Sequence, residues 1–350
     1  MQAAISNYVE LMKSPFISGH RKPRWLIMAS NVGHNLQTRL RMRYGHLQWE
    51  GGATHLHLPL EKSLDYIQRV YQDYLHYSSL RPGWLVGKRV LEIGPGDNLG
   101  VALRFIADGA RQVICVDKFF AKRDEQQQLR IYRALREQIR GAERERFDSA
   151  VQLGSPVSFN EQRLRYVHGV PAERANELLE PTSFDLIVSR AVLYEVRETD
   201  QAFKAMDQLL VPGGIMIHKI ACLDWMFPQN NYHPLEYLTV PEHVYRLMTD
   251  DSGKSNRRMM NYYRDKMDQL GYSATFHITR TLDSGKNDFP PGAICLQEGI
   301  HYTQDSLNLV RQIRPRLQPQ FRSLSDEDLL IQDMFLVAIK PDHGPAIGSR

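Results

Sequence analysis

Residues 89–117 constrain the fold of this chain more than any other segment. The apolar segment from Arg89 to Ile93 runs directly into Gly94-Pro95-Gly96, and a segment with helical spacing follows. Glycine permits a tight turn and lets a ligand approach the main chain, and a helix start offers unpaired N–H groups. A second apolar segment ends at Asp117, about 20 residues later, where a carboxylate can accept both hydroxyls of a ribose. These residues therefore predict a nucleoside-binding β-α-β unit.

The spacing of the glycines bears on which nucleoside is bound. Dinucleotide sites carry a third glycine at the sixth position of the motif, where the helix packs close to the pyrophosphate. Leu99 occupies that position here, and the next glycine is Gly100. An NAD enzyme is therefore a disfavoured alternative.

The remaining pattern predicts a parallel sheet with crossover helices, because short apolar segments alternate with amphipathic ones after Arg81-Pro82-Gly83. Asp97 or Asn98 is suited to cap the first of these helices. The expected strands are 89–93, 112–117, 164–168, 184–189, 215–220, 274–279 and 334–340, and the expected helices are 98–108, 124–146, 200–210 and 258–270.

Four segments in order resemble the class I S-adenosylmethionine-dependent methyltransferases. VLEIGPGDNLG resembles their first motif, with an acidic residue at Glu92 and glycine at position 100. FDLIVSRAVLYEV, LLVPGGIMIHKI and DLLIQDMFLVAIKP resemble their fourth strand, the unit leading into the fifth strand, and the closing antiparallel strand. The resemblance implies an enzyme that uses S-adenosylmethionine, with a Rossmann-like α/β fold and a seven-stranded, mostly parallel sheet.

The same resemblance implies a set of cofactor-binding residues. The glycine turn would lie against the methionine portion of the cofactor, and Asp117 would hold the ribose. Glu92 would orient the turn or reach the amino group through water. Val170 stands where many members carry an acidic residue, which leaves the adenine to backbone groups and apolar packing. The predicted cofactor-binding residues are Glu92, Gly94, Pro95, Gly96, Asn98, Asp117, Lys118, Val170, Ser189 and Arg190.

The acceptor chemistry depends on residues after the fourth and fifth strands. Ser189 to Val192 replace the NPPY-like or DPPY-like tetrapeptide that many amine methyltransferases carry, which favours a small-molecule or saccharide hydroxyl as acceptor. A hydroxyl must lose its proton, so a histidine or carboxylate base is expected. The predicted catalytic residues are His218, His233 and Asp224, with a packing role for His218 as the alternative. Tyr194-Glu195 is a further candidate for substrate contact, and no metal site is predicted.

Four regions are expected along the chain. Residues 1–80 form a mainly helical N-terminal extension on the acceptor side, with helical segments at 5–12 and 63–77. Residues 81–225 form the cofactor-binding core, 226–265 a lid insertion over the carboxyl edge of the sheet, and 266–350 the completion of the sheet. Because ligands of such sheets collect at that edge, we expect the extension and the insertion to form the acceptor pocket.

Charge leaves two alternatives open. The net charge is only +4, but no Asp or Glu occurs between positions 11 and 49. This basic segment fits a solvated face. It also fits a site for a phosphate or an anionic membrane surface, or the docking surface of an RNA or amine N-methyltransferase. A non-catalytic binding module on the same fold is the second alternative.

Three isolated cysteines and the lack of an apolar segment long enough to span a bilayer predict a cytoplasmic protein, with its oligomeric state undetermined.

Overall fold

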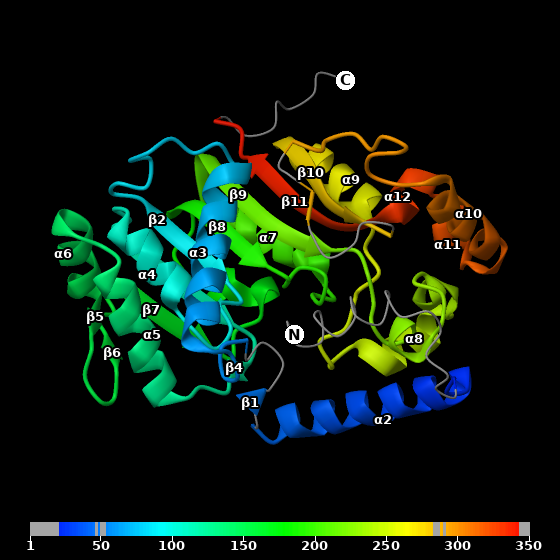
Figure 1. The fold of residues 1–350 in the computed structure, drawn as a ribbon, viewed down its shortest axis with the longest axis horizontal. Helices are drawn as coiled ribbons and strands as arrows, with labels where there is room; N and C mark the ends of the chain where they lie inside the picture. The colour runs from blue at the N-terminus through cyan, green and yellow to red at the C-terminus, as the bar shows by residue number, and fades with distance from the viewer. Residues whose placement is uncertain (1–20, 46–47, 50–53, 283–287, 290–291, 343–350) are drawn as a thin grey trace.

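The structure, a computed structural model, describes residues 21–45, 48–49, 54–282, 288–289 and 292–342. Its centre is a seven-stranded sheet in the order β10-β11-β9-β8-β2-β3-β7 (Figure 1). Strand β11 is antiparallel to both of its neighbours, whereas β7, β3, β2, β8 and β9 run parallel. The predicted Rossmann-like, mostly parallel sheet is therefore confirmed. The strands are β2 (Arg89–Ile93), β3 (Gln112–Asp117), β7 (Leu164–His168), β8 (Phe184–Arg190), β9 (Leu210–Ala221), β10 (Ser273–Thr281) and β11 (Ile331–Ile339).

Helices cover both faces of this sheet. Successive side chains of a strand point to opposite faces, so each strand packs against helices on both sides. Val90 and Val113 face α3 (Leu60–Tyr77), α4 (Gly100–Ala107), α5 (Glu125–Glu137) and α6 (Gly141–Ala150). Leu91 and Ile114 face α7 (Thr199–Leu209) and α9 (Met260–Leu270). Both faces are therefore apolar, which explains why the central strands read as continuous hydrophobic segments.

Two helix predictions need correction. The segment 124–146 forms two helices, α5 and α6, because the chain turns before Gly141, whose φ is 53°. The helix expected at 98–108 begins only at Gly100, after an N-cap residue, Leu99, that provides no side-chain hydrogen bond. Asp97 does not cap it, whereas the Asn98 side chain accepts the N–H of Gly100, the first helical residue, from the position before the N-cap.

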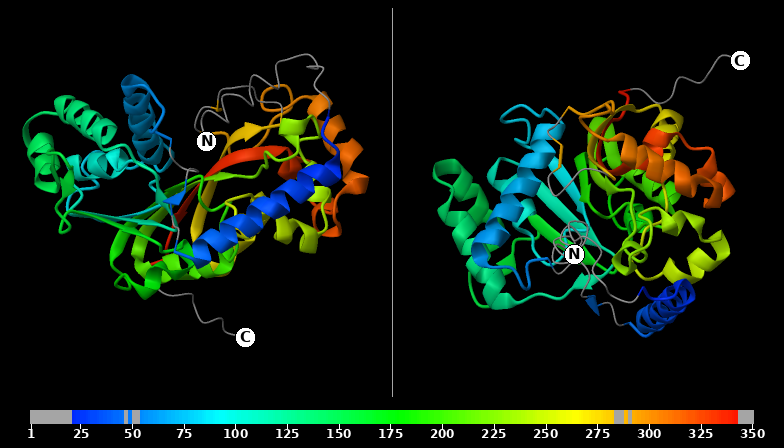
Figure 2. Two further views of the ribbon diagram at one scale, coloured as in Figure 1. Left: turned by 90° about the horizontal axis from the view of Figure 1, so that it is seen from below. Right: turned by 45° about the vertical axis from the view of Figure 1, so that its right-hand side comes forward.

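The N-terminal extension contains α3 and a longer helix, α2 (Arg24–Arg43). Helix α3 packs on the core through Ile67 and Tyr71, whereas Leu64 and Leu75 are only half-buried. Helix α2 lies along one side of the molecule against α8 (Glu242–Thr249), as Figures 1 and 2 show. The predicted helical segment 5–12 lies outside the described residues.

Residues after β9 contain more regular structure than the sequence predicts. The segment 228–255 shows no regular hydrophobic period in the sequence. It nevertheless includes η2 (Pro228–Asn230), η3 (Glu236–Thr239) and α8. Helices α10 (Gln304–Ile313), η4 (Arg314–Arg316), α11 (Pro319–Arg322) and α12 (Asp326–Leu330) precede β11. The smaller elements are β1 (Gln48–Trp49) paired with β4 (Phe120–Ala121), β5 (Val151–Gln152) paired with β6 (Ser158–Phe159), and η1 (Ala172–Glu177). No helix among the described residues is long and apolar enough to cross a membrane.

Candidate active site

A cavity of about 780 Å³ opens at the carboxyl ends of the parallel strands. Gly94 follows β2, Asp117 ends β3, and Val170, Ala191 and Leu223 follow β7, β8 and β9. Helix α2 and the segment 250–255 contribute further walls. This is the edge where α/β sheets bind their ligands, and the volume lies within the range of about 300–1,000 Å³ common for such sites.

The glycine turn after β2 forms one side of the cavity. Gly94 and Gly96 have φ values of 72° and 75°, a region that disfavours residues with a Cβ atom. A Cβ atom on Gly94 would lie 2.3 Å from Cγ2 of Val192, which follows β8. The turn is therefore pressed closely against the neighbouring strand end, and glycine at 94 is required for both reasons.

Asp117 lies beside this turn. Its Oδ2 accepts a hydrogen bond from the Gly96 N–H at 3.4 Å, and its Oδ1 accepts one from the Phe119 N–H at 3.3 Å. Burial raises the pKa of the Asp117 carboxyl to about 6. The carboxylate is thus fixed in the cavity wall and lacks a strong ionic partner.

Glu92, at the end of β2, is a second carboxylate in the same wall, with 6% of its surface exposed. The Cys115 thiol donates to its Oε2 at 3.6 Å. Burial, together with a smaller effect of the nearby Asp117 charge, raises the pKa of Glu92 to about 7. A cationic ligand in the cavity would relieve this cost.

Asp97 and Asn98 organise the turn and the start of α4. Asp97 Oδ2 accepts the N–H groups of His55 and Leu56, each at 2.8 Å. Asn98 Oδ1 accepts the Gly100 N–H at 2.7 Å, and its amide donates to Gln128 at 3.1 Å. Of the two predicted cap residues, Asn98 therefore satisfies the first N–H of α4, whereas Asp97 fixes the backbone at positions 55 and 56.

The chemistry of this wall fits S-adenosylmethionine. Asp97 Oδ1 and His55 Nδ1 are buried polar atoms of cavity-lining residues without a hydrogen-bond partner among the described residues. Burial raises the pKa of Asp97 to about 6 and lowers that of His55 to about 4. The buried carboxylates of Glu92 and Asp97 and the half-buried carboxylate of Asp117 suit a ligand that brings positive charge and hydroxyl donors.

The other predicted cofactor-binding residues divide into two groups. Lys118, Val170 and Arg190 line the cavity together with the turn residues Gly94, Pro95, Gly96 and Asn98. The Val170 N–H donates to the Asp117 carbonyl at 3.0 Å, and Arg190 Nη1 contacts Asp73 Oδ2 of α3 at 2.7 Å. Ser189 does not line the cavity.

His218, a predicted catalytic base, lies outside the cavity. It is fully buried in β9, with its ring edge-on to Phe203 of α7 and its Nδ1 2.8 Å from Ser189 Oγ. Burial lowers the pKa of the His218 imidazole to about 3. This position favours the packing alternative.

The other two predicted catalytic residues also differ in position. His233 does not line the cavity; its Nε2 contacts the Leu309 carbonyl at 3.2 Å, and its Nδ1 accepts the Leu235 N–H at 3.0 Å. Asp224 does line the cavity. Its carboxylate accepts the Met226 N–H at 2.8 Å and the Tyr245 hydroxyl at 3.2 Å, and burial raises its pKa.

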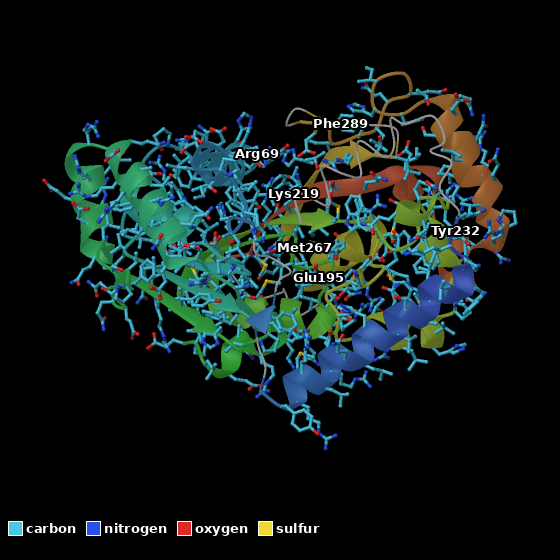
Figure 3. The ribbon with its side chains drawn as sticks, turned by 60° about the horizontal axis from the view of Figure 1, so that its bottom comes forward. Arg69, Glu195, Lys219, Tyr232, Met267 and Phe289 are labelled. Carbon is cyan, nitrogen blue, oxygen red and sulfur yellow. The ribbon has the colours of Figure 1, made fainter. Side chains whose placement is uncertain are left out.

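Glu195 is a further carboxylate of the cavity wall with a raised pKa. It follows β8 near the centre of the molecule (Figure 3) and lines the cavity beside Tyr194. Burial raises the pKa of Glu195 to about 7, although Tyr194 donates a hydrogen bond to it and Lys254 lies near. Ala191, earlier in the same turn, has a φ of 55°, a strained value for a residue with a side chain.

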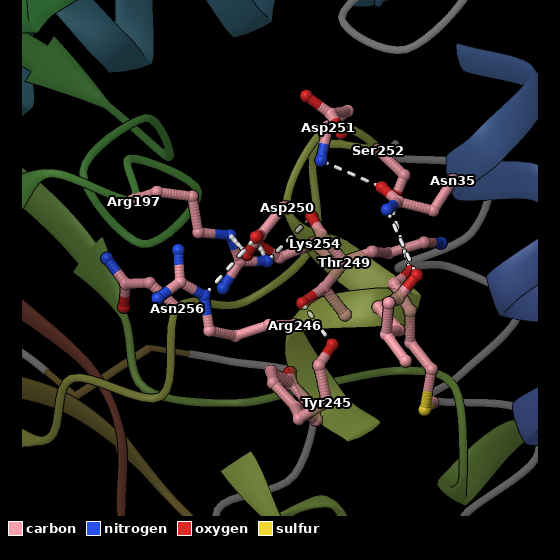
Figure 4. Close-up of polar contacts among 12 residues, drawn as sticks. Asn35, Arg197, Tyr245, Arg246, Thr249, Asp250, Asp251, Ser252, Lys254 and Asn256 are labelled. Carbon is pink, nitrogen blue, oxygen red and sulfur yellow. Dashed lines mark hydrogen bonds and ion pairs between the residues drawn. The ribbon is translucent and has the colours of Figure 1, made fainter. Parts of the chain in front are cut away.

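The wall opposite the glycine turn comes from segments far apart in the sequence. The Asp251 N–H donates to Asn35 Oδ1 of α2 at 2.7 Å, and the Asn35 amide donates to the Leu247 carbonyl at 3.0 Å (Figure 4). Arg197 binds the Thr249 and Ser255 carbonyls at 2.8 and 3.0 Å. Helix α2, segment 249–256 and the turn after β8 therefore form one connected wall.

Several cavity residues escaped sequence analysis. These are Asn31 and His34 of α2, His55, Tyr66 and Tyr74 near α3, and Lys254. The only sequence signal for this part of the cavity was Asp97, which lies inside the glycine motif and contacts the backbone of His55. Among the described residues, no group of three His, Cys, Asp or Glu side chains is arranged to hold a metal ion.

The sequence of residues 63–272 matches the family described as the methyltransferase domain, and the chain belongs to this family of S-adenosylmethionine-dependent enzymes. Its fold is similar to Haemonchus contortus phosphoethanolamine N-methyltransferase 2, at 17% identity and TM-score 0.40, over 78% of this chain and 52% of that one. The chain thus spans about half the length of that protein.

Two other solved structures are similar to the fold. The CurJ carbon methyltransferase matches at 13% identity and TM-score 0.40, over 97% of this chain and 70% of that one. An S-adenosylmethionine-dependent methyltransferase from Mesorhizobium loti matches at 15% identity and TM-score 0.39, over 81% and 100%. A comparison with curated proteins found no match.

Proposed function

We propose that this chain transfers a methyl group from S-adenosylmethionine to a hydroxyl group of a small molecule or saccharide, with Glu195 as the general base. The observation that carries the proposal is a carboxylate with its pKa raised to about 7 in the cavity that also contains the glycine turn. A base is most effective when its pKa lies near the working pH.

The cofactor would be held by residues of the β-α-β unit. The turn at Gly94 and Gly96 would accommodate its amino-acid portion, Asp117 the ribose hydroxyls, and the carboxylates of Glu92 and Asp97 its positive charge. When bound, this cofactor supplies a sulfonium methyl that is already activated for in-line transfer. The protein's own contribution is alignment, exclusion of water and removal of the acceptor proton.

Glu195 would take the acceptor proton on a carboxylate oxygen. The Tyr194 hydroxyl orients this carboxylate by a hydrogen bond, and the charges of Lys254, Arg197 and Lys118 favour its ionised form. These cations keep its pKa from rising beyond reach of neutral pH, while burial keeps it from behaving as an ordinary surface carboxylate. Asp224 lines the same cavity but already accepts two hydrogen bonds, which suits it to positioning.

Apolar side chains on the acceptor side would exclude water. Leu26 and Ile27 of α2 and Trp225 and Met226 after β9 line the cavity. A dry site strengthens the interactions of Glu195 with the acceptor and protects the methyl donor from hydrolysis. We therefore propose that residues 1–80 and the insertion 226–265 supply the acceptor pocket around the core 81–225, with 266–350 completing the sheet.

The acceptor class can be tested with methyl-labelled S-adenosylmethionine and panels of saccharides, hydroxylated metabolites, amines and RNA. Label recovered as a methyl ether supports the proposal. Label recovered only in amines or RNA would replace it with an N- or RNA-methyltransferase, and cofactor binding without transfer would favour a binding module.

We also propose a cytoplasmic location, which the free state of Cys115, Cys222 and Cys295 supports.

A further inference from the structure

Helix α2 exposes an apolar stripe on the side facing away from the protein. Trp25, Leu36, Leu40 and Tyr44 are 65%, 46%, 53% and 74% exposed. Their spacings are near whole numbers of helical turns, so that they share one face. The opposite face buries Ile27 together with the polar side chains of Asn35 and Thr38. A surface helix ordinarily turns its apolar side chains inward, so this outward stripe calls for a partner.

Basic side chains border the stripe. Arg41 and Arg43 are exposed in the last turn of α2. Arg21 and Lys22 are exposed just before its first turn, where Arg21 also lies over the Tyr232 ring and Lys22 also lines the cavity. No Asp or Glu occurs between positions 11 and 49. Arg24 and Arg39, in contrast, are used internally, where they pair with Glu236 and Asp251. The outward surface of α2 is therefore apolar along its middle and positive at its ends.

We propose that this stripe docks on an anionic lipid membrane, with α2 lying in the plane of the interface. Aromatic and aliphatic side chains enter the boundary between headgroups and acyl chains, and flanking Arg and Lys side chains bind anionic headgroups. RNA fits the observations less well, because it would meet Trp25, Leu36 and Leu40 where phosphate-binding side chains are needed. A basic helix with an exposed apolar face is typical of membrane-surface binding.

Docking through the stripe would also place the cavity relative to the lipid surface. Leu26 and Ser30, on the border of the stripe, are exposed and also line the cavity. Asn35 ties the inner face of α2 to the segment 249–256, which forms the same wall. Binding through the stripe therefore holds this wall of the cavity next to the lipid surface. This docking does not depend on which acceptor is methylated.

The test is cosedimentation of the full chain with vesicles, one set made of phosphatidylcholine and one also containing phosphatidylglycerol. We expect binding to the anionic vesicles that weakens with added salt. The double substitutions Trp25→Ser/Leu40→Ser and Arg41→Glu/Arg43→Glu should each lower the partition coefficient by about tenfold or more. Matched exposed pairs elsewhere, Leu178→Ser/Ile300→Ser and Arg130→Glu/Arg133→Glu, should bind as the unaltered chain does.

A second measurement does not depend on how the serine variants fold. Brominated acyl chains should quench the fluorescence of the bound chain, and Trp25→Phe, which preserves the apolar stripe, should remove much of that quenching while vesicle binding persists. The proposal is overturned if anionic vesicles fail to sediment the chain, or if the control pairs lose binding as much as the α2 pairs. It is also overturned if the chain binds labelled RNA through Arg41 and Arg43 and leaves vesicles unbound.

Discussion

His218 of β9 and Ser189 of β8 are register partners in the sheet, and the His218 Nδ1 lies 2.8 Å from the Ser189 Oγ. Both side chains are fully buried on the face that α7 covers. The pair joins two adjacent strand ends beneath the cavity. Its role is therefore expected in stability rather than in proton transfer.

The first prediction follows from this pair. Replacing His218 with Gln should leave the pH dependence of kcat unchanged and lower the free energy of unfolding by about 1–3 kcal/mol, because a buried hydrogen bond is disturbed. Thermal unfolding and a pH–rate profile measure the two effects. Turnover reduced about a hundredfold in a fully folded His218→Gln protein would return His218 to the role of base.

The second prediction concerns Glu195. Because its pKa is raised to about 7, the rate constant kcat/KM should rise with pH and level off above that value, since the base must be ionised. Glu195→Gln should lower turnover by roughly 10²–10⁴-fold with the affinity for S-adenosylhomocysteine nearly unchanged. Glu198→Gln, an exposed residue in the same segment, is the matched control. Full turnover in Glu195→Gln would show that the base is another residue, with Asp224 the next candidate.

The third prediction concerns the ribose site. Asp117→Asn should weaken S-adenosylhomocysteine binding by about 1–3 kcal/mol, because charge-assisted hydrogen bonds are lost. Isothermal calorimetry measures the change, and Asp148→Asn on the surface of α6 serves as the control. An unchanged dissociation constant would remove Asp117 from the cofactor site.

The fourth prediction is a pH dependence of stability. The pKa of Glu92 is raised from 4.5 to about 7 in the folded protein, so folding is favoured most below about pH 4.5 at this site and loses that contribution as the pH rises through 7. Glu92→Gln removes the effect, which amounts to roughly 3 kcal/mol at most. The fall in Tm of the ligand-free protein between about pH 5 and pH 8 should be smaller in Glu92→Gln. An equal fall in both proteins would contradict the raised pKa.

The fifth prediction tests the connected wall. Asn35→Ala removes two hydrogen bonds to the 247–251 backbone and should cost about 1–3 kcal/mol of local stability. Turnover should fall while cofactor affinity is preserved, because the β-α-β unit is untouched. Gln37→Ala, exposed on the same helix, should change neither quantity. A loss of cofactor affinity in Asn35→Ala would mean that the wall belongs to the cofactor site as well.

The central sheet could be predicted because its strands are buried on both faces. β2, β3 and β7 have the predicted bounds, since each is a short apolar segment between polar turns. Helix α2 could not be delimited in the same way. It buries Asn35 and Thr38 and exposes Trp25 and Leu40, so its hydrophobic pattern does not report which face packs on the protein.

The residues of the site also fall into those that the sequence could assign and those that it could not. Residues near the glycine motif could be assigned from local spacing, and all but Ser189 of the predicted cofactor set line the cavity. Ser189 falls outside because its side chain is fully buried beneath the cavity lining, where its Oγ lies 2.8 Å from His218 Nδ1. The role of Glu195 depends on burial and on Lys254, which is distant in the sequence, so no local pattern could rank it above His218.

The connection between α2 and segment 249–256 has a consequence for how the protein assembles and diversifies. Gly96 and Asp117 are 21 positions apart, whereas Asn35 and Asp251 are 216 apart. The half of the cavity near the glycine turn can form with the first β-α-β unit. The opposite half can form only when α2 contacts segment 249–256, which is distant in the sequence. Substitutions in that opposite half leave the early-folding unit intact. If that half holds the acceptor, as proposed, acceptor preference can change over evolution while the methyl donor stays the same.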